Sequence, residues 1–246
     1  MIKLMISDFD GTLMPYGESI VASSVLSAVN RLTDNGITFA VSSGRTYNEL
    51  LTFLPELSDK AYFICCDGAL CIHKDKVIYS RHIADEDLRF LAAYSDKGAS
   101  LVFHAAFRNY TLGSMPRKEG VCNGISIRKL SDINEKIYKV TAYGGEIKLP
   151  AYTGLRTHWD GGEYSCTQLV NRYCDKGVAL SDLQTRLMLT KYDTACIGDS
   201  GNDVAMMRGA KYSFCVGEKC EELMRACTFR VGSAGEALGC IADNCK

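Results

Sequence analysis

The stretch that decides the fold of this chain is IKLMISDFDGTL, residues 2–13. Its first part, Ile2–Ile6, is a short and mostly apolar run, typical of a strand buried in a parallel sheet. The polar residues Asp8, Asp10 and Thr12 follow almost at once. Open α/β sheets bind their ligands beyond the carboxyl ends of such strands. The stretch therefore predicts a parallel strand that delivers two carboxylates to a ligand-binding edge.

Two more polar segments follow apolar runs in the same way. Ser42-Ser43-Gly44-Arg45 comes after Ile37–Val41, and Gly198-Asp199-Ser200-Gly201-Asn202-Asp203 comes after Ala195–Ile197. A single lysine, Lys176, stands between these segments near the start of a predicted helix. Because the carboxyl ends of parallel strands meet at one edge, these groups are expected to lie together. They would supply a nucleophile, an acid/base, phosphate donors and a metal cradle.

Predicted strands and helices alternate on both sides of a central stretch. Before residue 82 we expect, besides the strands named above, a helix over 22–35 that ends at Gly36, a helix over 46–54, a strand over 61–66 and a hairpin over 69–73 and 77–80. After residue 173 we expect a helix capped by Asp175, the strand before Gly198, a helix through Met207, and a strand, helix, strand and helix over 212–242. Both sections together predict one α/β core with a parallel sheet.

The central stretch, residues 83–172, has a different texture. Charged and aromatic residues interleave there, glycines are frequent, and no carboxylate cluster of the first kind appears. A helix is expected over 85–95, strands over 100–104 and 138–143, and the start of a short helix over 133–136. We therefore predict an inserted α+β domain at 83–172, with the core formed by 1–82 and 173–246.

The order of these motifs resembles that of the haloacid dehalogenase (HAD) superfamily of aspartate-nucleophile phosphohydrolases. The family's order is kept by Asp8–Leu13, Ser43-Gly44-Arg45, Lys176 and Gly198–Asp203. Only a short flap and one helix fit between the first two motifs, so the insert lies after the second. In this it resembles the Cof-type sugar phosphatases with a class II (C2B-like) cap. The resemblance implies a doubly wound, Rossmann-like parallel sheet and an α+β cap that closes over the site.

The resemblance also implies a reaction. Asp8 would attack phosphorus to give an aspartyl-phosphate, and Asp10 would protonate the leaving alkoxide and then activate water. In the true dehalogenases of this family the position of Asp10 is not acidic, because a halide needs no proton. Asp10 therefore favours an oxygen leaving group. A lid over the cleft favours a small phosphorylated metabolite, such as a sugar phosphate, over a folded phosphoprotein.

A Mg²⁺ site and a phosphate cradle belong to the same resemblance. Asp8 and Asp199 would give carboxylate ligands and Asp10 its carbonyl oxygen, with Asp203 binding directly or through water. The residues expected to act in catalysis are Asp8, Asp10, Ser43 and Lys176. The residues expected to bind the substrate phosphate are Gly11, Thr12, Ser43, Gly44, Arg45, Lys176 and Asn202. For Arg45 there are two options, since it would either reach the phosphate or brace the neighbouring acids.

Composition argues against several other classes of protein. The 246-residue chain has a net charge of −1, and so has no basic field for nucleic acid and no polybasic membrane patch. No apolar run approaches membrane-spanning length and the first strand begins at the N-terminus, so a soluble, cytoplasmic protein is expected. Its twelve cysteines show no paired CxxC spacing for structural zinc. Reduced, buried thiols are expected in place of a disulfide framework.

Alternatives remain open at this point. Taken singly, the first motif is compatible with an Asx turn, the last with a helix cap and Lys176 with an exposed helix lysine, and only their conjunction favours catalysis. A phosphomutase on the same core would return the phosphoryl group to a second hydroxyl. A non-catalytic ligand-binding protein would keep the fold without turnover. The oligomeric state is not predicted.

Two further features of the sequence concern the substrate. Asp67-Gly68-Ala69 departs from the family's common Asn-Gly-Ala, although Asp suits the turn as well as Asn does. In the insert, side chains that would suit a sugar pocket, or equally packing and the surface, are those of His104, Arg108, Arg156, His158 and Trp159.

Overall fold

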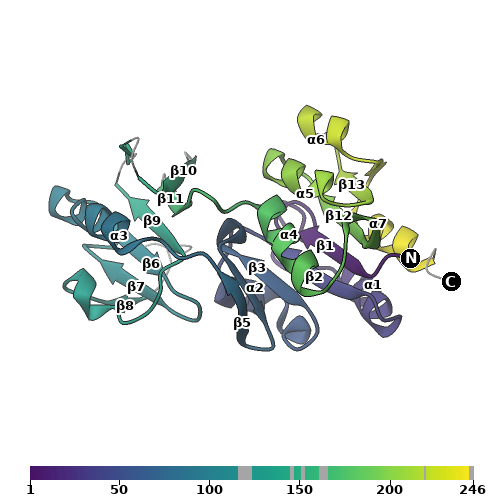
Figure 1. Ribbon diagram of the computed structural model, residues 1–246, viewed down its shortest axis with the longest axis horizontal. Helices are drawn as coiled ribbons and strands as arrows, with labels where there is room; N and C mark the ends of the chain where they lie inside the picture. Colours follow the sequence, from purple (N-terminus) through teal and green to yellow (C-terminus); the bar gives the residue numbers. More distant parts are fainter. Residues whose placement is uncertain (116–123, 145–146, 151–152, 161–165, 219, 244–246) are drawn as a thin grey trace. The chain divides into compact units, whose positions relative to one another are not determined.

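The computed structural model describes residues 1–115, 124–144, 147–150, 153–160, 166–218 and 220–243. The chain divides into two compact units (Figure 1). A core unit consists of residues 1–79 and 175–246, and an inserted unit consists of residues 80–174. The sequence places the insert at 83–172.

The core unit is built on an eight-stranded sheet with the strand order β14-β13-β12-β1-β2-β3-β4-β5. Neighbouring strands from β14 to β3 run parallel, and β4 turns back antiparallel to β3. The strands are β1 (Leu4–Asp8), β2 (Thr38–Ser42), β3 (Tyr62–Cys65), β4 (Leu70–His73), β5 (Lys76–Ser80), β12 (Thr194–Gly198), β13 (Tyr212–Val216) and β14 (Phe229–Val231). This parallel-rich sheet confirms the predicted doubly wound, Rossmann-like core.

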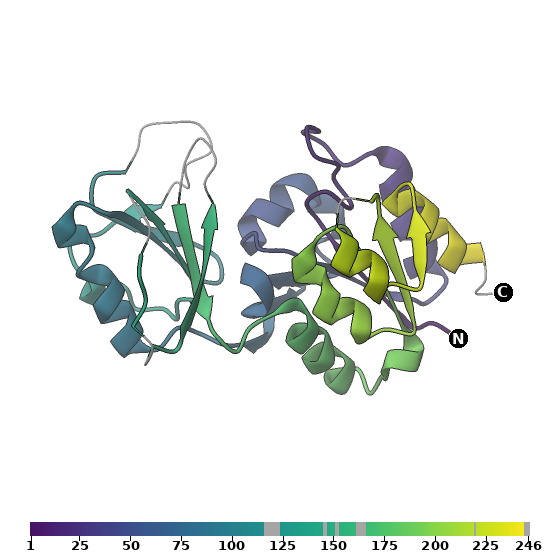
Figure 2. The same cartoon turned by 90° about the horizontal axis from the view of Figure 1, so that it is seen from above.

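Helices cover this sheet in two groups. α1 packs against α7, while α5 packs against both α4 and α6 (Figures 1 and 2). The helices of the core unit are α1 (Ser23–Asp34), α2 (Tyr47–Phe53), α4 (Lys176–Arg186), α5 (Val204–Arg208), α6 (Glu221–Ala226) and α7 (Ala234–Asp243).

Helix ends in the core unit follow the signals in the sequence. Gly36 has a φ of 78° and lies just beyond α1. Its amide donates to the carbonyl of Thr33, and the amide of Ile37 donates to the carbonyl of Leu32. This pair of bonds is the Schellman motif that glycine favours. Asp175 caps α4, because its carboxylate accepts a hydrogen bond of 2.7 Å from the amide of Val178. The predicted stop and start are therefore both confirmed.

The inserted unit contains a six-stranded sheet with the order β10-β11-β9-β6-β7-β8. All its neighbours run antiparallel except β7 and β8. Its elements are α3 (Asp85–Ala92), β6 (Ser100–His104), β7 (Asn109–Leu112), β8 (Ile125–Ser126), β9 (Lys139–Tyr143), β10 (Leu155–Asp160) and β11 (Cys166–Asn171). One sheet face shares a hydrophobic cluster with α3, formed by residues such as Leu91, Phe103 and Val140.

Two expectations for the insert are wrong or incomplete. Residues 133–136 are not helical; a 3₁₀ turn ends just before them at Leu130–Asp132, and Ile133 is extended. The Asp132 carboxylate accepts the amides of Arg128 and Lys129, which fixes the start of this turn, while the extended Ile133 packs on the hydrophobic cluster. The elements that the sequence predicts do not include the strands β7, β8, β10 and β11.

The structure also bears on the expectations about membranes and thiols. Within the described part of the chain, no helix has both the length and the apolar character needed to span a bilayer. The cysteines of that part form no disulfide, and those on the sheet, such as Cys65, Cys71 and Cys196, are buried.

Candidate active site

Three neighbouring strands bring the predicted motifs to one edge of the core sheet. β1 lies between β2 and β12, with Asp8 opposite Ser42 and Ser7 opposite Ile197. The chain leaves each of these strands at the same edge because all three run parallel. The residues that follow them are thus neighbours in space although they are far apart in the sequence.

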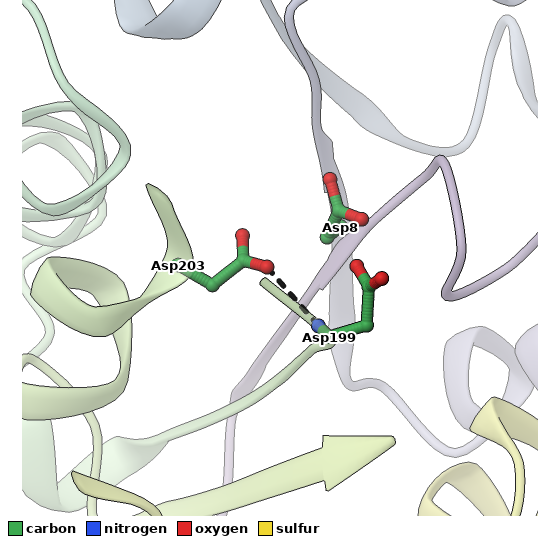
Figure 3. A group of neighbouring side chains, drawn as sticks. All are labelled: Asp8, Asp199 and Asp203. Atoms are coloured by element: carbon green, nitrogen blue, oxygen red, sulfur yellow. Dashed lines mark hydrogen bonds between the residues drawn. The ribbon is translucent and has the colours of Figure 1, made fainter. Parts of the chain in front are cut away.

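An acidic cluster forms at this edge (Figure 3). One carboxylate oxygen from each of Asp8, Asp199 and Asp203 lies within 4.8 Å of the others, and all three residues are buried. Lys176, the first residue of α4, is 2% exposed and points into the cluster. Its Nζ donates to Asp8 Oδ1 at 2.5 Å and to Asp203 Oδ1 at 2.7 Å. One ammonium therefore joins the first predicted motif to the last.

The charges of this cluster are not balanced. Three carboxylates face one ammonium, and burial raises the pKa of Asp8 to about 7 against the pull of Lys176, with Asp203 and Asp199 adding to the rise. Burial and Asp203 likewise raise the pKa of Asp199. Burial alone would lower the pKa of Lys176, but the carboxylates of Asp8 and Asp203 outweigh it and hold this pKa above its usual value. The cluster is short of positive charge.

Asp203 holds the loop after β12 together. Its Oδ2 accepts the amides of Asp199 and Ser200, each at 3.1 Å, while its Oδ1 accepts Lys176. A Cβ at Gly198 would lie only 2.6 Å from the carboxyl carbon of Asp203, so this strand end needs a glycine. With both oxygens engaged, Asp203 is better placed to support a metal through its neighbours than to bind it alone.

Asp10 lies outside the cluster and is held by Arg45. The guanidinium donates to both carboxylate oxygens, from Nε at 2.9 Å and from Nη2 at 2.7 Å. Its carbon lies 5.4 Å from the ring centroid of Phe9 and 5.0 Å from that of Phe53, so the cation is stacked on two rings. Of the two options for Arg45, the structure contains the contact that braces an acid. Two carboxylates two residues apart thus have different partners.

Ser43 and its neighbours lie beside Asp10. The Ser43 hydroxyl is 3.4 Å from Asp10 Oδ2 and accepts the Arg45 amide at 3.1 Å. Next to it, a Cβ at Gly44 would lie 3.1 Å from Oδ1 of Asp67. The turn that contains Asp67 is tied to this loop, since its amide donates to the carbonyl of Ser43.

The sequence predicts a turn at Asp67-Gly68 but not the unusual backbone that the structure has there. Cys66 and Asp67 have φ values of 53° and 55°, and Gly68 follows with 92°. Non-glycine residues rarely adopt this region, and those that do cluster at functional sites. A Cβ at Gly68 would lie 2.5 Å from the carbonyl oxygen of Asp175. The turn therefore packs between the second motif and the start of α4.

Gly11 and Thr12 differ from expectation in one respect. Both amides take part in the turn after β1, since Gly11 donates to Met14 at 2.8 Å and Thr12 to Phe9 at 3.3 Å. Both residues reach the site in another way. The Thr12 hydroxyl donates to Asp199 Oδ1 at 3.3 Å, and Gly11, with a φ of 83°, makes room for the Asp199 carboxylate. Their role as phosphate donors stays a prediction.

Asn202 lies at the exposed end of the last motif. Its side-chain oxygen accepts the Ser200 hydroxyl at 2.6 Å. The contact holds the amide group inside its own loop, and its role at the phosphate stays a prediction.

The candidates in the inserted unit are spread over different surroundings. His104 is buried, with both ring nitrogens hydrogen-bonded to Asn109 and Thr141 at 2.9 Å. Arg108 forms an ion pair of 3.0 Å with Glu135. These contacts give His104 and Arg108 structural partners within their own unit.

The candidates on β10 are His158, Arg156 and Trp159. His158 is exposed, and Nε of Arg156 is buried without a hydrogen-bond partner among the described residues. Strand pairing places Arg156 in one cross-strand row with His104, on the sheet face away from α3. The side chain of Trp159 lies outside the described residues.

Comparison with known proteins agrees with this geometry. The chain matches the haloacid dehalogenase-like hydrolases over residues 5–241. It belongs to this family. Among curated relatives, the HMP-PP phosphatase of Enterobacter sp. (strain 638) is 27% identical, over 91% of this chain and 87% of the relative. The 5-amino-6-(5-phospho-D-ribitylamino)uracil phosphatase of Escherichia coli (strain K12) is 21% identical, over 94% and 91%.

Solved structures show the same fold. A HAD subclass IIB sugar phosphatase superposes with a TM-score of 0.76 at 20% identity, covering 98% of this chain and 97% of that one. The resemblance drawn from the order of the motifs is confirmed: the chain is a HAD phosphatase of the Cof type.

Mg²⁺ is the ion that HAD phosphatases generally use, and the chemistry of the acidic cluster fits it. Carboxylate oxygens are the donors that this hard cation prefers. A divalent cation would also supply the positive charge that the cluster lacks and would lower the raised pKa of Asp8. Asp8 and Asp199 are the residues whose carboxylates would hold it, with Asp203 behind them.

Proposed function

We propose that this chain is a Mg²⁺-dependent phosphomonoesterase that hydrolyses a small phosphorylated metabolite, most simply a sugar phosphate, through an aspartyl-phosphate. The observation that carries the proposal is the pair of unlike carboxylates on one turn. Asp8 is buried against Lys176, whereas Asp10 is half-buried and held by Arg45. Phosphoryl transfer to an aspartate needs such a pair, one group as nucleophile and one as acid/base.

The roles of the residues follow from their surroundings. Lys176 orients the Asp8 carboxylate and offsets negative charge where the phosphoryl oxygens would gather. The Ser43 hydroxyl is a donor at the same edge. Bound Mg²⁺ would neutralise charge between the acids and the phosphate. Asp10 would give its proton to the leaving oxygen and later take one from the attacking water.

The substrate class is supported by what the relatives act on. The curated relatives are named for HMP-PP and for a phosphorylated ribitylaminouracil, and the solved structure for sugar phosphates. All are small phosphorylated metabolites. A small substrate also agrees with an inserted domain that acts as a cap, a role that we propose for residues 80–174.

The test is phosphate release from a panel of sugar phosphates, nucleotides, pyridoxal phosphate and an aryl phosphate, with Mg²⁺ or with EDTA. Wild type is compared with Asp8→Asn, which keeps the shape of the side chain but cannot form the acyl phosphate. We expect metal-dependent release that falls by about a thousandfold or more in the variant. A variant that retains substantial activity would refute Asp8 as the nucleophile.

Two other functions predict different results. A phosphomutase would require a bisphosphate activator and would return the phosphoryl group to a sugar hydroxyl, so little phosphate would appear. A binding protein would show no turnover at all. Asp8, Asp10, Ser43, Lys176 and Asp199 are all present and close together at one edge, which favours an enzyme over the binding protein.

A further inference from the structure

The segment after the first motif carries a tyrosine with an unexpected contact. Residues 15–20 are all exposed, and Tyr16 is 63% exposed overall. The sequence alone gives it no role, because an exposed aromatic residue in a polar loop is ordinary. Its polar end, however, does not point to solvent.

The turn after β1 brings this ring back over the site. Met14 donates to the Phe9 carbonyl at 2.9 Å and accepts the Gly11 amide at 2.8 Å, which closes the turn tightly. Cε2 and Cζ of Tyr16 then lie 2.4 and 2.7 Å from the point where a Cβ of Gly11 would be. Oδ2 of Asp199 lies 2.3 Å from the same point. Because Cζ carries the hydroxyl, the polar end of the ring meets the carboxylate.

The contact is a hydrogen bond between the Tyr16 hydroxyl and the Asp199 carboxylate. An ionised carboxylate only accepts hydrogen bonds, so the phenol is the donor. Burial of this end of the ring raises the pKa of Tyr16 to about 12, and the negative charges of Asp199 and Asp8 add to the rise.

Asp199 thus has two hydrogen-bond donors from one loop. Thr12 donates to Oδ1 at 3.3 Å, and Tyr16 donates to the same carboxylate. Both donors follow β1, whereas Asp199 follows β12. Residues that hydrogen-bond a ligating carboxylate fix its orientation, and their loss commonly weakens metal binding by about 10- to 100-fold.

We propose that Tyr16 is a positioning residue for the metal site, which holds the Asp199 carboxylate toward Asp8 and thereby sets the affinity for Mg²⁺. The inference rests on the proposed function, because it concerns the ion that phosphoryl transfer needs. It adds a residue from outside the family motifs, and no substrate contact is required of it.

The test is the Mg²⁺ dissociation constant of the metal-free protein, measured by titration calorimetry without substrate. Tyr16→Phe removes only the hydroxyl, and we expect it to weaken Mg²⁺ binding by about tenfold or more. The melting temperature of the metal-free protein should stay unchanged, because the ring is retained. Excess Mg²⁺ should restore turnover, since no group that touches substrate is lost.

A matched control is Tyr192→Phe. Tyr192 is likewise exposed, and it precedes β12 whereas Asp199 follows it. The Tyr192→Phe variant should bind Mg²⁺ with the affinity of the wild-type protein. If Tyr16→Phe binds Mg²⁺ with the same affinity as wild type, the role of Tyr16 is overturned and the phosphatase proposal stays intact. The same conclusion follows if Tyr192→Phe loses as much Mg²⁺ affinity as Tyr16→Phe. A wild-type protein that binds no Mg²⁺ would overturn both proposals.

Discussion

A lysine that is almost completely buried is the most telling single residue of this protein. Lysines are rarely removed from water unless paired, and Lys176 is paired with both Asp8 and Asp203. Its neighbour in the sequence, Asp175, is explained by helix capping alone. Two adjacent residues thus have different roles. The side chain of Asp175 caps the helix, and the side chain of Lys176 is directed to the acids.

Asp10 gives a prediction that separates binding from turnover. Asp10→Asn keeps the size of the side chain but cannot exchange protons, so kcat should fall by about 100- to 10,000-fold. KM should change little, since Asp10 is held by Arg45 and is not part of the metal cluster. Steady-state kinetics on the best substrate of the panel would measure both values. An unchanged kcat would remove Asp10 from the mechanism.

The raised pKa of Asp8 predicts how Mg²⁺ binding depends on pH. Burial raises this pKa from 3.8 to about 7, so below pH 7 the ion must displace a proton. Affinity should fall by about tenfold for each pH unit below 7 and level off above it. In the metal-free protein the folded state keeps a proton that the unfolded chain releases. Asp8 should therefore lower stability as pH rises from about 4 to 7.

Calorimetric titrations between pH 5.5 and 8, with melting curves in EDTA, would check both trends. Asp8→Asn is the control for the melting curves, because its amide does not titrate. A Mg²⁺ affinity that is flat across this range in wild type would show that Asp8 is already ionised at the low end.

At the scale of elements, the contact between α4 and α5 decides where Lys176 lies. A Cβ at Gly177 would lie 2.7 Å from the Cβ of Ala205 and 2.8 Å from its carbonyl carbon. Real Cβ atoms essentially never come within 3.0 Å of a non-bonded atom, and the backbone of Ala205 cannot move away as a flexible side chain can. The glycine that follows the lysine therefore allows the two helices to approach each other closely.

Gly177→Ala should push α4 away from α5 and move the lysine from its acids. We expect a loss of about 1–3 kcal/mol in unfolding free energy from overpacking, together with a loss of activity. Chemical denaturation and phosphate release would measure the two effects. Gly239→Ala is the matched control, because Gly239 lies inside α7 with nothing within 4 Å of a Cβ. The Gly239→Ala variant should gain about 1 kcal/mol in unfolding free energy, because alanine has the higher helix propensity. Equal behaviour of the two variants would contradict the packing argument.

At the scale of the molecule, the sequence predicts the core better than the insert. Buried parallel strands are continuous apolar runs with polar residues at their ends, so β1, β2 and β12 and their motifs are visible in sequence. Strands β10 and β11 are not, because one face of their sheet is polar and its residues on these strands, such as Arg156, His158 and Gln168, interrupt the apolar pattern. Local patterns also miss the left-handed turn at Cys66 and Asp67.

The site shows the same division between local and distant information. Residues inside the motifs are found by spacing, but Tyr16 gains its role only through a contact with Asp199 across the sheet. No pattern within either loop encodes that contact. Likewise the sequence leaves two options for Arg45, and the position of Phe53 on α2 helps to direct the guanidinium to Asp10.

The place of β1 between β2 and β12 has a consequence for the order in which the protein is made. As the chain leaves the ribosome, β1 and β2 emerge early, but the other neighbour of β1 begins only at Thr194. Until then one edge of the strand that carries Asp8 has no hydrogen-bonded neighbour. The whole inserted unit is synthesised during this interval. A nascent chain that has not yet reached Asp203 carries Asp8 but lacks part of the acidic cluster. The acidic cluster is therefore completed only late in synthesis, once Asp203 has been added to the chain.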